Sequence, residues 1–77
     1  MLEKIKPIIA ETLNIDEIAI TLEVRLKDDL GIDSLDAVEL IMGLEDEFDV
    51  KIEDIEAQAF VTIADVVNLL EDKLRTN

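Results

Sequence analysis

Aliphatic residues recur at intervals of three and four positions along three segments of this chain, and this spacing restricts the folds open to it. Side chains three or four positions apart share one face of an α-helix, so each segment is predicted to form an amphipathic helix. The segments run from Leu2 to about Leu13, from Leu35 to about Asp49 and from Thr62 to about Arg75. Their inward-facing residues are expected to be Leu2, Ile5, Ile8, Ile9 and Leu13 in the first, Ala37, Leu40, Ile41, Leu44 and Phe48 in the second, and Ile63, Val66, Val67, Leu70 and Leu74 in the third.

Local signals indicate where these helices begin. Asp33 is a suitable N-cap, because a side-chain oxygen can accept a hydrogen bond from the free backbone N–H groups at a helix start. Thr62 followed by Asp65 resembles a capping box, with Asp in the usual Glu position. Pro7 is tolerated if the first helix starts late enough for residue 7 to lie in its first turn, where the backbone N–H has no intrahelical partner.

The stretch from Asn14 to Asp33 has no clean helical period, although aliphatic residues continue through it. We expect a long loop whose buried aliphatic side chains hold it against the core. Alternation from Ile20 to Leu26 leaves a β-strand as the alternative, but no comparable segment is available to pair with it. The aliphatic residues of this loop are Ile15, Ile18, Ile20, Leu22, Val24, Leu26 and Leu30.

Together these elements predict an all-α fold, a four-helix bundle of three longer helices and one short helix, with a long first loop. The short helix is expected from Glu53 to about Ala59. A chain of 77 residues can build one core only, so residues 1–77 are expected to form a single domain. The N-terminal segment mixes polar and apolar residues, so neither a signal peptide nor a membrane span is expected, and we predict a cytoplasmic monomer.

Charge and missing residue types exclude several functions. Seven basic residues stand against 20 acidic ones, giving a formal charge of −13 at pH 7, so nucleic acids are repelled and basic protein surfaces are attracted. Without His or Cys the chain lacks the usual general base, thiolate nucleophile and zinc ligands, so we expect no enzyme and no metal site. The acidic runs Glu45-Asp46-Glu47 and Glu53-Asp54 could bind calcium or magnesium weakly through their oxygens, but they lack EF-hand spacing and are interpreted as solvated surface.

The second helix carries apolar residues on the face that should be polar. On a helical wheel, Leu35, Val38 and Met42 lie opposite the inward stripe. A single exposed apolar residue is ordinary on a protein surface, but three on one face inside a charged rim are typical of a docking surface. We therefore interpret this face as a surface for a partner protein. The acidic residues around it are Glu39, Glu45, Asp46 and Asp49.

Ser34 lies directly before this helix face and has two possible roles. A serine at a helix start commonly caps free N–H groups. Asp33 can already act as the cap, however, and the helix start would stabilise a phosphate ester through its dipole and its amides. The Ser34 hydroxyl is therefore well placed to become a phosphodiester.

The residues around Ser34 form a longer recognisable string. Asp28 to Asp36 has the sequence DDLGIDSLD, followed by Val38-Glu39-Leu40 and by LEDEF ending at Phe48. This string resembles the acyl carrier proteins of type II (dissociated) bacterial fatty acid synthesis, whose attachment motif Asp-Ser-Leu lies within D-L-G-x-D-S-L-D-x-V-E-L. Length, acidity and helix pattern agree with this resemblance over essentially the whole chain.

The resemblance implies a carrier function. Ser34 would accept 4′-phosphopantetheine from coenzyme A through a phosphopantetheinyl transferase (holo-acyl carrier protein synthase), and the arm would hold growing acyl chains as thioesters. Further implied partners are acyltransferases, ketosynthases, reductases and dehydratases with basic docking patches. The implied partner-binding residues are Asp33, Leu35, Asp36, Val38, Glu39, Met42, Glu45 and Asp46, and the implied acyl pocket is formed by Ala37, Leu40, Ile41, Leu44, Phe48, Ile52 and Ile63.

Two alternatives remain at this point. The same arm on Ser34 could carry polyketide, aminoacyl or D-alanyl cargo, although the DLGxDSLD run favours a fatty acyl group. A protein of another class, an unmodified acidic interaction protein, would need no serine at the helix start. Glu53 stands where the family often has Pro, and the segment after it is more apolar than usual, which leaves acyl chain length open.

Overall fold

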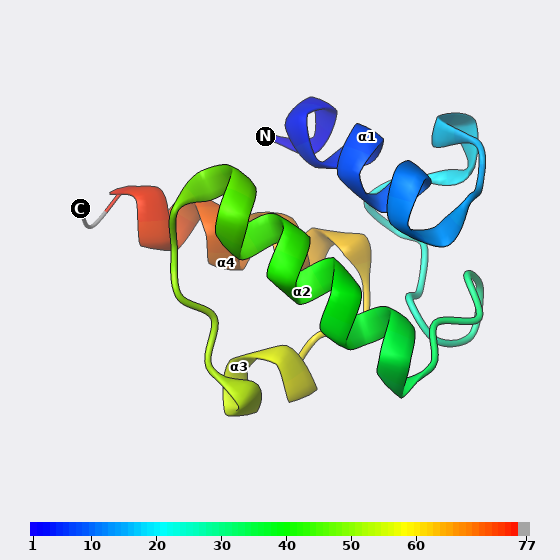
Figure 1. The fold of residues 1–77 in the computed structure, drawn as a ribbon. Helices are drawn as coiled ribbons and strands as arrows, with labels where there is room; N and C mark the ends of the chain where they lie inside the picture. The colour runs from blue at the N-terminus through cyan, green and yellow to red at the C-terminus, as the bar shows by residue number, and fades with distance from the viewer. Residues whose placement is uncertain (76–77) are drawn as a thin grey trace.

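Helices joined by loops make up residues 1–75, the part of the chain that the structure, a computed structural model, describes. The prediction of an all-α fold with three longer helices, one short helix and a long first loop is confirmed (Figure 1). A short 3₁₀ helix within the first loop was not predicted from the sequence. The elements are α1 (Leu2–Leu13), η1 (Glu17–Ala19), α2 (Ser34–Phe48), α3 (Asp54–Gln58) and α4 (Ile63–Arg75).

The longer helices pack side by side around one core. Figure 1 shows α2 across the middle of the molecule, α1 above it, α4 behind it and the short α3 below. Helices α1 and α2 approach closely at Gly43, where an added Cβ would lie 3.4 Å from Cγ2 of Ile8. Position 43 is therefore a point of close approach between the two helices.

The fully buried core consists of aliphatic side chains from α1, α2, α4 and the loops, and α3 adds only the half-buried Ala57 that packs against it. The inward faces predicted for the helices are confirmed except at Leu74, which is 39% exposed. Leu74 lies one turn beyond Leu70, where α4 extends past the core. The buried residues are Ile5, Ile9, Ile20, Leu26, Ile32, Leu40, Leu44, Ile52, Ile63, Val66, Val67 and Leu70.

The first loop is held against the core as expected, through buried Ile20 and Leu26. Two of its aliphatic residues, Ile18 and Leu22, are 84% and 42% exposed, so the expectation that they are buried was wrong. Ile18 belongs to η1, whose three residues all face solvent. Because η1 as a whole lies at the surface, Ile18 remains in solvent, whereas Ile20 directly after η1 is buried.

The strand alternative is reduced to one antiparallel bridge between Arg25 and Thr62. The N–H of Leu26 donates to the carbonyl of Val61 at 2.9 Å, and the N–H of Ile63 donates to the carbonyl of Val24 at 3.0 Å. The alternation at residues 20–26 therefore marked extended backbone. Its partner, the segment just before α4, is too short to continue the ladder.

The predicted span of the first helix is confirmed, and Pro7 lies inside α1 rather than in the first turn, where it would be tolerated most easily. The helix starts at Leu2, with the N–H of Lys4 bonded to the carbonyl of Met1 at 3.0 Å. Pro7 is exposed, and water can satisfy the carbonyl of Glu3 that loses its usual donor. Ile5 and Ile9, both fully buried on either side of Pro7, hold the helix in place.

Candidate functional site

The site at the start of α2 is built by a tight turn. Gly31 has φ of +67°, a left-handed conformation that glycine adopts without strain. Ile32 is buried next to it, and its N–H donates to the carbonyl of Leu26 at 3.1 Å. The turn is thus anchored in the core immediately before Asp33 and Ser34.

Asp33 caps α2, as the sequence predicted. Its Oδ1 accepts the N–H of Asp36 at 2.9 Å, and Oδ2 of Asp36 lies 3.5 Å from the N–H of Asp33, which makes a reciprocal capping box. Ser34 is the first residue of the helix and is exposed. Its hydroxyl makes no hydrogen bond to any residue from 1 to 75, so it is available for chemistry.

The residues present fit a phosphate group on Ser34. First-turn N–H groups and the helix dipole give the start of α2 a partial positive charge that stabilises a phosphodiester. The exposed hydroxyl leaves room for a long substituent. Because the Asp33 and Asp36 carboxylates are engaged with each other's backbone N–H groups, the cap does not depend on the Ser34 oxygen.

The apolar face predicted on α2 is exposed. Leu35, Val38 and Met42 have 67%, 55% and 61% of their surface accessible. Of the acidic residues predicted around them, Asp33, Glu39 and Asp46 are exposed, whereas Asp36 and Glu45 are half-buried. Met42, Glu45 and Asp46 also line a shallow hollow on this face together with Gly43.

Ile55 on α3 is 77% exposed and was not assigned to any surface from the sequence. A helix of five residues is too short to show the periodicity that would separate an inward from an outward position. The structure therefore adds an apolar side chain on α3 that sequence reasoning did not assign to a face.

Glu45 has a contact within the protein that the sequence did not reveal. Its Oε2 accepts the N–H of Ile52 at 2.7 Å across seven positions of the chain. No local sequence signal predicts this bond, because it depends on how the loop after α2 turns back.

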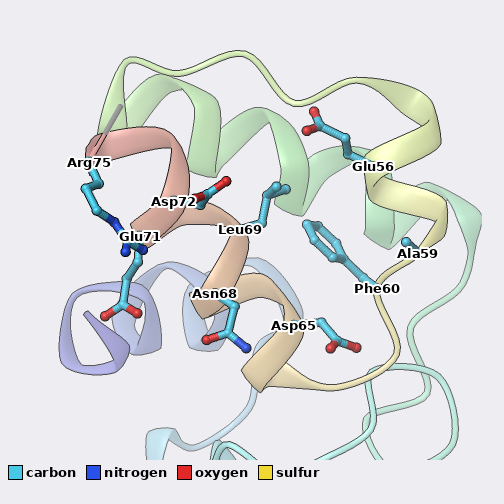
Figure 2. Close-up of a pocket in the computed structure, with 9 residues that line it drawn as sticks. All are labelled: Glu56, Ala59, Phe60, Asp65, Asn68, Leu69, Glu71, Asp72 and Arg75. Carbon is cyan, nitrogen blue, oxygen red and sulfur yellow. The ribbon is translucent and has the colours of Figure 1, made fainter. Parts of the chain in front are cut away.

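The residues implied for an acyl pocket belong to the core or border it. Leu40, Leu44, Ile52 and Ile63 are buried, and Ala37, Ile41 and Phe48 pack against them half-buried. A separate hollow lies between α3 and α4, where Figure 2 shows Phe60 and Leu69 together among polar side chains. This hollow contains none of the seven implied pocket residues. Its lining is Glu56, Ala59, Phe60, Asp65, Asn68, Leu69, Glu71, Asp72 and Arg75.

Electrostatic contacts hold the ends of α3 and α4. The N–H of Glu53 and the ammonium of Lys73 both contact Oε1 of Glu56, at 2.9 and 3.0 Å, and these contacts lower the pKa of Glu56.

Residues 1–75 contain no group of three carboxylates arranged to hold a metal ion. Within the same range, no helix has the length and apolar character needed to cross a membrane.

An exposed serine hydroxyl at the capped start of a helix in a small bundle is the arrangement that a carrier needs in order to hold a prosthetic group through a phosphate ester. Residues 3–70 match the family model described as "Phosphopantetheine attachment site". The chain is 48% identical over 71 residues to an acyl carrier protein of Thermotoga maritima, covering 92% of this chain and 88% of the relative.

Comparison with solved structures gives the same result. A candidate acyl carrier protein from Mycobacterium tuberculosis aligns with a TM-score of 0.87 and 41% identity, over 92% of this chain and 95% of that chain. The chain belongs to the acyl carrier protein family, and its cofactor is covalently bound phosphopantetheine.

Proposed function

We propose that this protein carries growing acyl chains as thioesters on a 4′-phosphopantetheine arm attached to Ser34, for enzymes of fatty acid synthesis. The observation that supports this most directly is the free, exposed hydroxyl of Ser34 beside a cap supplied by Asp33. Ser34 is also the only serine in the chain. Residues 1–77 act as one carrier domain, as a monomer in the cytoplasm.

The chain's own residues have limited chemical roles in this proposal. Ser34 supplies the ester oxygen, and the first turn of α2 stabilises the phosphate charge. The bound group supplies the thiol that a chain without cysteine lacks. Without His or Cys the protein assembles no nucleophile and base pair, so it is not itself an enzyme.

The exposed face of α2 is the proposed docking surface. An apolar centre with an acidic rim suits partners with a basic patch: the phosphopantetheinyl transferase, acyltransferases, ketosynthases, reductases and dehydratases. The apolar centre is Leu35, Val38 and Met42, and the rim is Asp33, Asp36, Glu39, Glu45 and Asp46.

The proposed place for the acyl chain is among the apolar residues between α2, the loop after it and α4. These residues are Ala37, Leu40, Ile41, Leu44, Phe48, Ile52 and Ile63. Since the inner members of this set are fully packed, side chains must move apart when a chain enters.

Attachment is tested by incubating the protein with coenzyme A and a phosphopantetheinyl transferase, followed by intact-protein mass spectrometry. We expect a covalent mass increase for the wild type and none for Ser34→Ala. The Ser34→Ala variant keeps the Asp33 cap, so its helical circular dichroism should equal that of the wild type. Absence of any mass increase with several competent transferases would favour an unmodified interaction protein.

Docking is tested with the double variant Val38→Glu and Met42→Glu. Burying unpaired carboxylates in the centre of an interface should lower kcat/KM of a partner enzyme by roughly tenfold or more. The matched control is Val61→Glu with Ile18→Glu, because these side chains are 58% and 84% exposed and lie outside α2. Equal turnover of both double variants would contradict the docking surface.

The cargo is identified by intact-protein mass spectrometry of the loaded protein purified from its native host.

A further inference from the structure

Glu45, near the C-terminal end of α2, accepts hydrogen bonds from the loop that follows this helix. Its backbone carbonyl accepts the N–H of Asp49, which has φ of +53°, and the N–H of Val50 at 3.2 Å. Its side chain then accepts the N–H of Ile52 at 2.7 Å. One residue of α2 thus binds three N–H groups of the loop that follows it.

The hydrogen bond from the Ile52 N–H to the Glu45 carboxylate belongs to a class that is stronger than a hydrogen bond between two neutral groups. A carboxylate acceptor makes a charge-assisted hydrogen bond, and partial burial reduces competition from water. The Ile52 side chain is 4% exposed, so the bond attaches the loop at the point where it enters the core.

Beyond Ile52, α3 has one apolar side chain packed against the core, the half-buried Ala57. None of the residues in Asp54–Gln58 is buried. The position of α3 therefore depends on neighbouring anchors, of which Ile52 is the one on the side of α2. The contact between Glu56 and Lys73 supplies an anchor on the side of α4.

Within the proposed acyl pocket, Ile52 is the one member that lies outside a helix. Leu40 and Leu44 belong to α2, and Ile63 is the first residue of α4, where helical hydrogen bonds restrain the backbone. Ile52 lies in a loop, and a single side-chain bond holds its N–H.

We infer that Glu45 is a positioning residue whose carboxylate holds residues 49–53 closed over the core and so controls the insertion of an acyl chain beside Ile52. The second half of this inference rests on the proposed function. Glu45 would serve the carrier through its contact with Ile52, in addition to any contact with a partner enzyme.

The first test measures amide hydrogen exchange by NMR in the unmodified protein. In Glu45→Ala we expect the Ile52 amide to exchange roughly tenfold faster or more, after correction for global stability from amides of α4. The matched control is Glu47→Ala, an exposed glutamate on the same helix, in which Ile52 should exchange as in the wild type.

Two conservative variants distinguish the effect of side-chain length at position 45 from the effect of its charge. Glu45→Gln keeps an acceptor at the same distance and should restore much of the protection at Ile52. Glu45→Asp keeps the charge but is one methylene shorter, so it should fail to restore protection, and it also replaces Glu45→Ala if that variant does not fold. Equal exchange at Ile52 in the Ala, Asp and Glu47→Ala variants would overturn the inference.

The second test uses protein loaded with an acyl chain and measures cleavage of the thioester by hydroxylamine. If Glu45 holds the loop closed over an inserted acyl chain, its loss should release the chain and expose the thioester. Cleavage in Glu45→Ala should then be several-fold faster than in Glu45→Gln and Glu47→Ala. Equal cleavage rates would overturn the acyl half of the inference even if Ile52 exchanges faster. A wild-type chain that accepts no arm would overturn the proposed function and the acyl half together, whereas the exchange result alone decides whether Glu45 holds the loop.

Discussion

Ser34 and Asp33 divide two tasks that both residue types can perform. Each has a side-chain oxygen able to cap a helix, but the structure assigns the cap to Asp33 through the N–H of Asp36 at 2.9 Å. Ser34 is then left with an exposed hydroxyl at the electropositive end of α2. This division allows the serine to be esterified without weakening the start of the helix.

Gly43 provides a stability prediction at the same scale. Because an added Cβ would lie 3.4 Å from Ile8 Cγ2, an ordinary contact distance, Gly43→Ala should be accommodated. The variant should raise the free energy of unfolding by about 0.5–1 kcal/mol through helix propensity, measured by urea denaturation. Gly31→Ala is the opposing control: space is open there, but φ of +67° should make alanine cost about 1–2 kcal/mol. Loss of stability in Gly43→Ala would mean that α1 and α2 cannot yield by a few tenths of an ångström.

At the scale of the element, α4 begins with the capping box that the sequence predicted. Oδ2 of Asp65 accepts the N–H groups of Thr62 and Val61 at 3.0 and 2.8 Å, and Oγ1 of Thr62 lies 3.3 Å from the N–H of Asp65. These backbone hydrogen bonds favour the charged carboxylate and lower the pKa of Asp65 below its ordinary value of 3.8. The same carboxylate therefore fixes both the start of α4 and the approach to it.

The capping box predicts a specific pH dependence. As the pH falls, the unfolded chain protonates Asp65 first, near 3.8, so the stability from this group is complete above that value and is lost as the pH falls through the lower folded value. Asp65→Asn should lose less stability than the wild type over this range, in urea unfolding at a series of pH values. Parallel pH profiles of the two proteins would show that the Asp65 charge does not stabilise the cap.

At the scale of the whole molecule, the net charge destabilises the compact state. The formal charge of −13 is spread over a chain with few bases, although residues 1–75 include the ion pairs of Arg25 with Asp28 and of Lys73 with Glu56. Self-repulsion at this charge destabilises the folded state, while the same charge attracts basic partners.

Salt should therefore stabilise the protein. Screening worth about 1 kcal/mol would raise Tm by about 4–8 °C between low and high sodium chloride, measured by circular dichroism. Glu11→Lys with Glu23→Lys, two exposed positions outside the proposed site, should raise Tm at low salt and reduce the salt effect. A Tm that stays constant through the salt titration would contradict this explanation.

Much of the site was predictable because it depends on local interactions. The Asp33 and Thr62 caps join residues three positions apart, and the outward positions of Leu35, Val38 and Met42 follow from the helical period. The string around Ser34 predicted the family, which the comparisons confirmed. The acyl pocket stays a prediction, since its residues are packed in this structure.

The sequence by itself determined the four α-helices, the N-terminal caps of α2 and α4, the net charge and the position of the single serine, because each of these depends on composition or on neighbours within one helical turn. The tertiary structure alone decided that Pro7 lies inside α1, that Ile18 is exposed and that Glu45 binds the N–H of Ile52. These features depend on where segments distant in the chain meet and on which side of a helix or loop faces water. Local sequence allows several conformations at these positions, and tertiary packing determines which one is adopted.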